Sequence, residues 1–300
     1  MLPQIRKISN NESFKNNIYL VREVADLPEK VFSPEETEYI NSRLAEKDQD
    51  IVVINKLGRT SVICRLATND SANAGALNEK CRKTGESLLG IFAGHKTESV
   101  SITDVAGNHA ATLAFAEGMA LGNYQFLRYR KDQKEKESAL QTIAISSPDL
   151  DEKSLAELNI LCKAVYACRS LVNEPVASLN AEKLASDFET MAHEAGVKIE
   201  MLNKQKIEAL KMGGLLAVNR GSLDPPTFSI MEYKPKHAVN PKPIVLVGKG
   251  VVYDTGGISL KPTASMDTMK CDMSGAAAVA SAIYAIALAK LPVHVVALVP

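Results

Sequence analysis

The sequence predicts an α/β fold in two domains, each built from strands and helices in alternation. The chain has 300 residues, which is long for one compact core, because domains commonly hold about 100–200 residues. Segments rich in Val and Ile alternate with segments that have helical spacing of apolar residues. One charged stretch, residues 130–138, reads as a hairpin tip or a solvated loop. We expect an α/β domain with a mixed sheet over 1–147 and an incomplete α/β domain over 148–300.

The first domain contains predicted strands rich in Val and Ile and bounded by polar turns, namely residues 18–24, 50–57, 60–67, 88–94, 99–106 and 140–147. Helical spacing predicts helices over 33–48, 76–89 and 107–129. The first of these begins at Ser33-Pro34, with Glu36 placed for a capping box.

The second domain continues the alternation. Helices are predicted over 154–173, 180–196 and 204–214, with a fourth after Ser274, its expected N-cap. Strands are predicted over 197–202, 227–233, 243–249 and 293–299. Asn173-Glu174-Pro175 ends the first of these helices. The two sheets are therefore expected to be largely parallel or mixed.

Composition excludes several classes of function. The formal net charge is zero, which gives no electrostatic reason to expect nucleic acid or an acidic membrane as a partner. The first residues lack the apolar core of a signal peptide, and the apolar run 276–289 is shorter than the ~20 residues of a membrane span. Five scattered cysteines indicate neither a disulfide framework nor a thiolate zinc site. We expect a soluble cytoplasmic protein.

The stretch "VGKGVVYDTGGISLKPTASMDTMKCDMSGAAAV", residues 247–279, places charges and glycines between an apolar strand and an apolar helix. Lys249 and Asp254 are five apart, so on a straight strand they would face opposite sides of the sheet. A bend between them brings both to one side, and Gly248 and Gly250 supply backbone freedom. Asp272 precedes the helix. These groups are expected to meet at the edge of a sheet, where open α/β sheets place their sites.

Two carboxylates and an amine suit Mg²⁺, Mn²⁺ or Zn²⁺. A lysine binds a metal only after it loses a proton, which a dication can promote. Two metals would activate a water and polarise a carbonyl, and Lys261 would donate to the developing oxyanion. Spacing alone leaves two alternatives: salt bridges of the two lysines with Asp254 and Asp272, or a phosphate loop, for which the Gly-Lys spacing is wrong.

"VGKGVVYDTGGISLKP" and "MDTMKCDMSGAAAV" resemble the metal-binding signature of the leucyl (cytosol) aminopeptidase family, and "RSLVNEPVASLNAEKLA", "MGGLLAVNRGSLDPPTFSIMEY" and "EGMALGNYQFLRYR" are also similar to that family. The resemblance implies two divalent metal ions, Zn or Mn and possibly Mg. It implies that Lys249 and Asp272 bind one metal and that Asp254 bridges both. It also implies that Lys261 is catalytic and polarises the scissile carbonyl, while Met269 lines the side-chain pocket.

The same resemblance implies release of N-terminal amino acids, leucine-like ones preferred, from peptide substrates, by a homo-hexamer. The family also uses a later "NTDAEGR" element, with further metal ligands and an arginine that holds a bicarbonate. That element does not occur in this sequence. We therefore expect a truncated catalytic domain, inactive by itself. The alternative is a non-catalytic binding module on the same fold.

Overall fold

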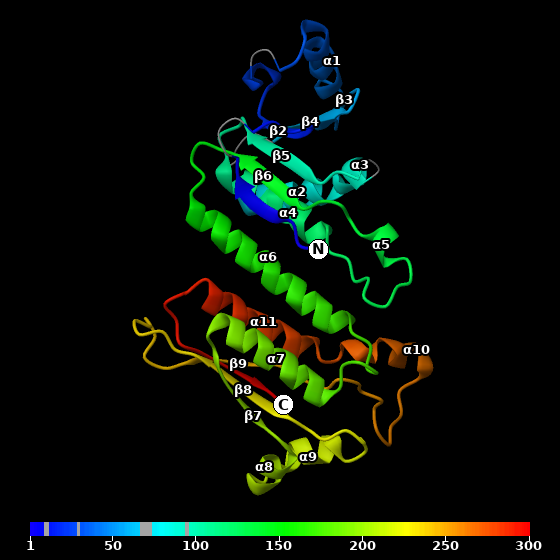
Figure 1. Ribbon diagram of the computed structural model, residues 1–300, viewed down its shortest axis with the longest axis vertical. Coiled ribbons are helices and arrows are strands. Elements are labelled where there is room, and N and C mark those ends of the chain that lie inside the picture. Colours follow the sequence, from blue (N-terminus) through cyan, green and yellow to red (C-terminus); the bar gives the residue numbers. More distant parts are fainter. Residues whose placement is uncertain (9–11, 29–30, 67–73, 94–95) are drawn as a thin grey trace. The chain divides into compact units, whose positions relative to one another are not determined.

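The computed structural model describes residues 1–8, 12–28, 31–66, 74–93 and 96–300 (Figure 1). The chain divides into two compact units, Met1–Cys162 and Lys163–Pro300. Helix α6 (Glu152–Asn173) runs through this division. The expected domain boundary at 147/148 stays a prediction. Each unit has a mixed sheet with helices, so the predicted α/β class is confirmed.

The sheet of the first unit has six strands in the order β1-β6-β5-β2-β4-β3. They are β1 (Gln4–Lys7), β2 (Asn16–Val21), β3 (Ile51–Lys56), β4 (Arg59–Arg65), β5 (Ser99–Asp104) and β6 (Thr142–Ser146). Adjacent strands are parallel, except that β3 runs antiparallel to β4. The parallel strands β2, β4 and β5 therefore begin at one common edge of the sheet.

The helices of this unit are α1 (Pro34–Leu44), α2 (Ala74–Ser87), α3 (Leu89–Ala93), α4 (His109–Gly122) and the short α5 (Gln133–Lys136), with a 3₁₀ turn over Val24–Asp26. The predicted capping box of α1 is present, because Ser33 and Glu36 each accept the other's backbone N–H. Helices α2 and α4 pack at very short range. A Cβ on Gly118 would lie 2.0 Å from the carbonyl oxygen of Arg82, and one on Gly85 would lie 2.2 Å from that of Phe115.

Two predictions in this unit are wrong, and one strand was missed. Residues 89–93 of the expected strand 88–94 form α3, and residue 94 lies outside the described residues. Leu88 and Phe92, four apart, are both buried. Periodicity cannot distinguish a buried helical turn from a buried strand in so short an apolar run. The helix expected over 107–129 ends at Gly122. Strand β1 was not predicted, because it is short and polar. Its backbone is held by Asn159 of α6, which bonds both the N–H and the carbonyl oxygen of Ile5.

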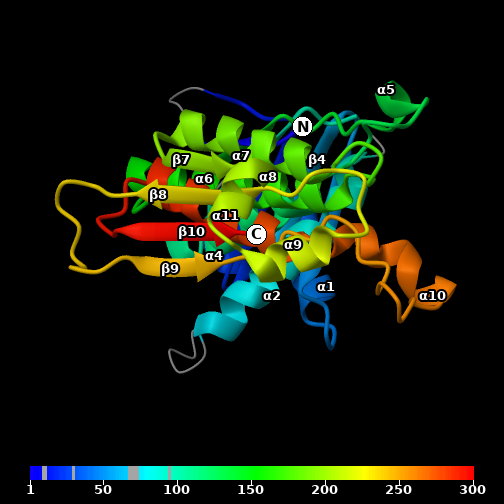
Figure 2. The same ribbon diagram turned by 90° about the horizontal axis from the view of Figure 1, so that it is seen from below.

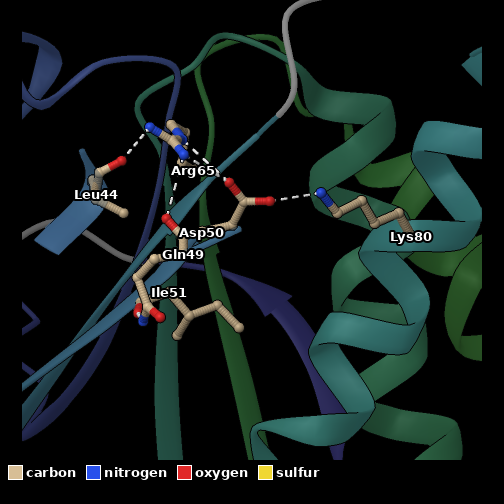
Figure 3. A network of polar contacts seen from close by, with 6 residues as sticks. All are labelled: Leu44, Gln49, Asp50, Ile51, Arg65 and Lys80. Atoms are coloured by element: carbon tan, nitrogen blue, oxygen red, sulfur yellow. Dashed lines mark hydrogen bonds and ion pairs between the residues drawn. The ribbon is translucent and has the colours of Figure 1, made fainter. Parts of the chain in front are cut away.

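A polar network joins α1, β4 and α2 around Asp50, which precedes β3 (Figure 3). Arg65 Nη2 lies 3.0 Å from Asp50 Oδ1, and Lys80 Nζ lies 2.7 Å from Asp50 Oδ2. Arg65 also donates to the carbonyl oxygen of Leu44, at 2.6 Å. Lys80, and after it Arg65, lowers the pKa of the Asp50 carboxyl group.

The sheet of the second unit has the order β7-β8-β10-β9. Its strands are β7 (Lys198–Leu202), β8 (Phe228–Tyr233), β9 (Ile244–Val247) and β10 (Val295–Val299). Figure 2 shows β8, β10 and β9 side by side. β10 is antiparallel to β8 and parallel to β9, so β9 and β10 end at the same edge.

Helices α7 (Ala181–Ala195) and α11 (Ser274–Leu288) pack against the sheet of the second unit and against each other. Phe188 of α7, Met231 of β8 and Ile283 of α11 meet in the core. The remaining helices are α8 (Lys204–Ala209), α9 (Gly213–Asn219), α10 (Thr263–Met266) and a 3₁₀ helix, η3 (Asp267–Cys271). The segment Thr263–Leu288 is long and apolar enough to span a membrane by length and composition, but half of its most apolar window is buried. The buried residues of α11, Ala276, Ala280 and Ile283 among them, belong to the core of the second unit.

Two expectations for this unit need correction. Met273 is the N-cap of α11 and Ser274 its first residue, without a side-chain cap. The chain enters α11 from η3, and Asp272 already has helical backbone angles, so no extended capping residue precedes the helix. The helix expected over 204–214 breaks after Ala209. Lys211 has a φ of 54°, a left-handed conformation that ends α8 before α9 begins.

Candidate metal centre

Lys249 lies where the first turn of α11 meets the carboxyl end of β9. The carbonyl oxygen of Lys249 accepts the N–H of Ala276, at 3.0 Å. The N–H groups of Gly248 and Gly250 bond to Leu298 and Pro300, so pairing with β10 continues past β9 on both sides of the lysine. The backbone of Lys249 is therefore fixed by two neighbouring elements.

The glycines beside Lys249 permit close packing. A Cβ on Gly248 would lie 2.7 Å from the carbonyl oxygen of Gly275, and one on Gly250 would lie 2.4 Å from that of Pro300. Neither glycine has a positive φ. The expectation that they supply backbone freedom is therefore wrong, and their role is to let neighbouring backbone segments approach closely. The backbone conformations that favour glycine lie further along the chain, at Gly256 and Gly257, whose φ angles are 91° and 77°.

Two ion pairs join the predicted site residues. Lys249 Nζ lies 2.6 Å from Asp272 Oδ2, and Lys261 Nζ lies 3.0 Å from Asp254 Oδ2. Asp254 also accepts the N–H of Gly256, at 2.8 Å. The pKa of Asp254 is lowered chiefly by Lys261, then by the Gly256 N–H, with a smaller contribution from Lys249. Lys249 thus pairs with Asp272 and acts on Asp254 only through its charge.

The buried oxygen of Asp272 is incompletely satisfied. Among the described residues, Asp272 Oδ2 has no partner with hydrogen-bond geometry, although Lys249 Nζ is 2.6 Å away. The contact therefore satisfies the distance of an ion pair but not the directional geometry of a hydrogen bond. Lys249 therefore compensates the charge of Asp272 without a well-directed hydrogen bond, whereas a metal cation needs no donor angle. This donor set fits a divalent metal, with the amine of Lys249 as second ligand once it has lost its proton.

Met269 and Lys261 are brought together by the loop that carries α10 and η3. Lys261 Nζ contacts Met269 Sδ, at 3.1 Å, and the hydroxyl of Tyr253 donates to the carbonyl oxygen of Met266, at 2.9 Å. A cavity of about 360 Å³ lies beside Lys249, bordered by Phe188, Val252 and Tyr253 among others. Met269 is not among the residues that border it.

Two positioning residues escaped the sequence analysis. Lys270 Nζ donates to the carbonyl oxygen of Asn173, at 2.8 Å, and Cys271 Sγ lies 3.6 Å from that of Val172. Both contacts tie η3 to the last turn of α6. A lysine at the negative end of a helix is favourable, but Lys270 and Asn173 are 97 positions apart. No local signal in the sequence reveals that pairing.

Few of the usual metal-binding residue types gather at the candidate centre. Within the described ranges, no three residues of the types His, Cys, Asp and Glu gather to hold a metal. The proposed metal donors are thus Asp254, Asp272 and Lys249. Together with Lys261 they form two ion pairs, which also match the salt-bridge alternative. The geometry brings Lys249 to Asp272 and Lys261 to Asp254, and the roles of these residues stay predictions.

Comparisons with known proteins agree with the motif. A family model for the catalytic domain of the cytosol aminopeptidase family matches residues 166–300. The probable cytosol aminopeptidase of Chlorobaculum tepidum is 44% identical over 244 residues, which cover 75% of this chain and 47% of that protein. That of Clostridium perfringens is 32% identical over 308 residues, covering all of this chain and 59% of that protein. The chain spans about half the length of the curated relatives it matches.

Solved structures are similar over nearly the whole chain. The bottromycin maturation enzyme BotP, in complex with Mn, is 25% identical, with a TM-score of 0.75, over 96% of this chain and 59% of that one. A tomato leucine aminopeptidase mutant, 20% identical, shares the fold with a TM-score of 0.76 over 99% of this chain and 62% of its own. The resemblance carried by the motifs around Lys249 and Asp254 is thereby confirmed, and the chain belongs to the cytosol aminopeptidase family.

Proposed function

We propose that this chain carries part of the metal centre of an aminopeptidase that releases N-terminal residues, leucine-like ones preferred, from peptides. The observation that supports this most strongly is the buried Asp272 Oδ2, which lies 2.6 Å from the amine of Lys249, so that a carboxylate oxygen and a nitrogen donor converge at one point. Asp272 and Lys249 would hold one metal and Asp254 would bridge to a second. The metal content of the BotP complex favours Mn²⁺, and Zn²⁺ suits the same ligands.

When bound, the metals supply an activated water and polarise the carbonyl of the substrate. The chain's own groups orient the reaction. Lys261 is held by Asp254 Oδ2 at 3.0 Å and by Met269 Sδ at 3.1 Å, so its ammonium is positioned without full burial. It would donate to the oxyanion that develops on the scissile carbonyl. Bicarbonate, a hexameric assembly and a cytoplasmic location are expectations from the family, whose relatives are named cytosol aminopeptidases.

A metal titration tests this assignment. Mn²⁺ binding to the 300-residue chain, followed by the loss of the free Mn²⁺ electron paramagnetic resonance signal, should weaken on the order of tenfold or more in Asp272→Asn. The matched control is Asp267→Asn, because Asp267 lies in the same loop, is exposed and makes no ion pair in the described part of the chain. Equal effects of the two substitutions would contradict the assignment.

The two ion pairs favour a second candidate, a non-catalytic binding module in which these charges only hold the loops together. In that case Asp272→Asn would lower thermal stability with no change in Mn²⁺ binding. The metal-centre proposal expects the opposite: a large effect of Asp272→Asn on Mn²⁺ binding and a small one on thermal stability. Removal of the incompletely bonded carboxylate should cost little stability without metal, and should abolish the stabilisation that Mn²⁺ gives to the folded chain.

A further inference from the structure

We propose that the first unit binds an anion that carries a diphosphate group, in a depression at the edge where β2, β4 and β5 begin. The depression has a volume of about 800 Å³. It is formed by three segments: residues 13–16 before and at the start of β2, residues 55–60 around the β3–β4 turn, and residues 96–99 before and at the start of β5. This edge is the opposite of that at which open α/β sheets usually place their sites. The site is independent of the metal centre of the second unit.

Positive charge gathers at this depression. Lys15, Lys56, Arg59 and Lys96 line it, against one carboxylate, Glu98. The chain as a whole has no net charge, so the local excess is not a general property of the protein. An excess of cations around one depression raises the local concentration of anions.

Neighbouring carboxylates offset only part of this excess. Glu36, outside the depression, pairs with Lys56 at 2.6 Å. Lys56 lowers the pKa of Glu36 most among its charged neighbours, and Arg59 adds a smaller effect. Lys15 and Lys96 have no ion pair in the described part of the chain. Even with Glu36 counted beside Glu98, two positive charges remain uncompensated.

The depression also contains a buried hydroxyl group, that of Thr97, whose hydrogen-bonding capacity is unsatisfied in the described part of the chain. Thr97 is 7% exposed, and its Oγ1 atom has no hydrogen-bond partner in the part of the chain that the structure describes. Thr60, 6% exposed, lines the same depression from the start of β4. An unsatisfied buried hydroxyl is unfavourable unless a ligand accepts its hydrogen bond. Phosphate oxygens are strong acceptors, so an anion that reaches the Thr97 hydroxyl would satisfy it together with the lysines.

A neighbouring depression shows that the charge excess is local. It shares Lys96 and Thr97, but its other charged residues balance, since Lys134 and Lys136 lie among Glu135 and Glu137. The basic depression is therefore the better place for a multiply charged anion. With Glu98 subtracted, the four cations of the depression leave three positive charges, which match a diphosphate group at about 1.5 negative charges per phosphate. Its cations come from three separate segments, which a single small phosphate would not bridge as well.

Isothermal titration of the 300-residue chain with inorganic diphosphate tests the site, with sulfate at equal ionic strength as the blank. We expect saturable 1:1 binding that weakens about tenfold or more in the double variant Lys15→Gln, Lys96→Gln. The matched control Lys83→Gln should change binding less than about twofold, because Lys83 lies on α2 outside the depression and is 76% exposed. A parallel titration with ADP separates the sources: equal or tighter binding indicates a nucleotide diphosphate, and binding of inorganic diphosphate alone indicates the free ion.

Thr97 distinguishes a built site from a loose group of lysines. Thr97→Val removes the hydroxyl without changing charge and should weaken diphosphate binding about threefold or more, while the unliganded variant unfolds at an equal or higher temperature. Thr97→Ser should retain the affinity of the unaltered chain. The proposal is overturned if the unaltered chain shows no saturable binding, if Lys83→Gln weakens it as much as the double variant, or if Thr97→Val binds as tightly as Thr97→Ser.

Discussion

Single residues in the candidate centre have contacts that the sequence does not specify. Spacing placed Lys249, Asp254 and Asp272 at one sheet edge, but it could not pair Lys249 with Asp272 or Lys261 with Asp254. That pairing depends on where η3 lies, and η3 is held by Lys270 and Cys271 through the end of α6. Long-range contacts of this kind leave no local pattern in the sequence.

Lys261→Ala should lower turnover of a leucyl amide by roughly 10²–10³-fold, as removal of one oxyanion donor does, in a form of the protein that has activity. Metal content should stay near that of the unaltered protein, because Lys261 contacts Asp254 and Met269 and is not itself a proposed ligand. Steady-state kinetics beside elemental analysis measure both. Loss of metal in proportion to loss of turnover would make Lys261 a structural residue.

Asp50 gives a pH-dependent prediction. Lys80 and Arg65 hold its pKa below the ordinary value of 3.8. A depressed carboxyl pKa contributes stability above pH ~4 that is lost as pH falls through the folded-state value. At pH 7, Asp50→Asn should cost no more than about 1 kcal/mol, since the pair is partly exposed to solvent.

Urea unfolding of Asp50→Asn and of the unaltered chain at pH 7 and at pH 3 measures this difference. The gap between the two proteins should shrink at pH 3. The control Asp48→Asn, two positions away and without an ion pair in the described residues, should show no such pH dependence. A constant gap at both pH values would mean that Asp50 acts through packing and not through charge.

Elements with a strong pattern are predicted well from sequence, and short apolar runs are not. The capping box at Ser33 and Glu36 fixed the start of α1, whereas "LLGIFAG" fits a strand or a buried helical turn equally well. The spacing of α2 and α4 also has no local signature. Gly85 and Gly118 permit it only because each faces a backbone carbonyl oxygen of the other helix.

Gly118→Ala should destabilise the first unit by about 1–3 kcal/mol, because the added Cβ would overlap the backbone of Arg82 and force the helices apart. Gly75→Ala, in α2 with nothing within 4 Å of its Cβ position, should be neutral or stabilise by up to about 1 kcal/mol. Thermal unfolding of both variants checks the contrast. Equal effects would show that the two helices do not pack at this range.

At the scale of the whole molecule, the alternation of strands and helices and the signature around Lys249 predicted the α/β class and the family, and both are confirmed. Strand order could not be derived in the same way. In the second unit, β8 is antiparallel to both β7 and β10, and β9 is parallel to β10. These pairings join segments that are distant in the sequence.

The assembled donors also predict the activity of the 300-residue chain. Lys249, Asp254 and Asp272 supply three ligand side chains, whereas two metals that each take four or more ligands need further donors. With added Mn²⁺ or Zn²⁺, hydrolysis of a leucyl chromogenic amide should stay at the level without metal. Metal-dependent turnover equal to that of a full-length relative assayed in parallel would show that other residues of this chain complete the centre.

The most direct measurement is the anomalous scattering of Zn²⁺ in crystals of the chain soaked with the metal. The account predicts a peak about 2.0–2.2 Å from Asp272 Oδ2 and from Lys249 Nζ, with the 2.6 Å contact between these two atoms replaced by bonds to the metal. Anomalous peaks elsewhere, with both ion pairs intact, would contradict the assignment of this edge of the sheet as a metal centre.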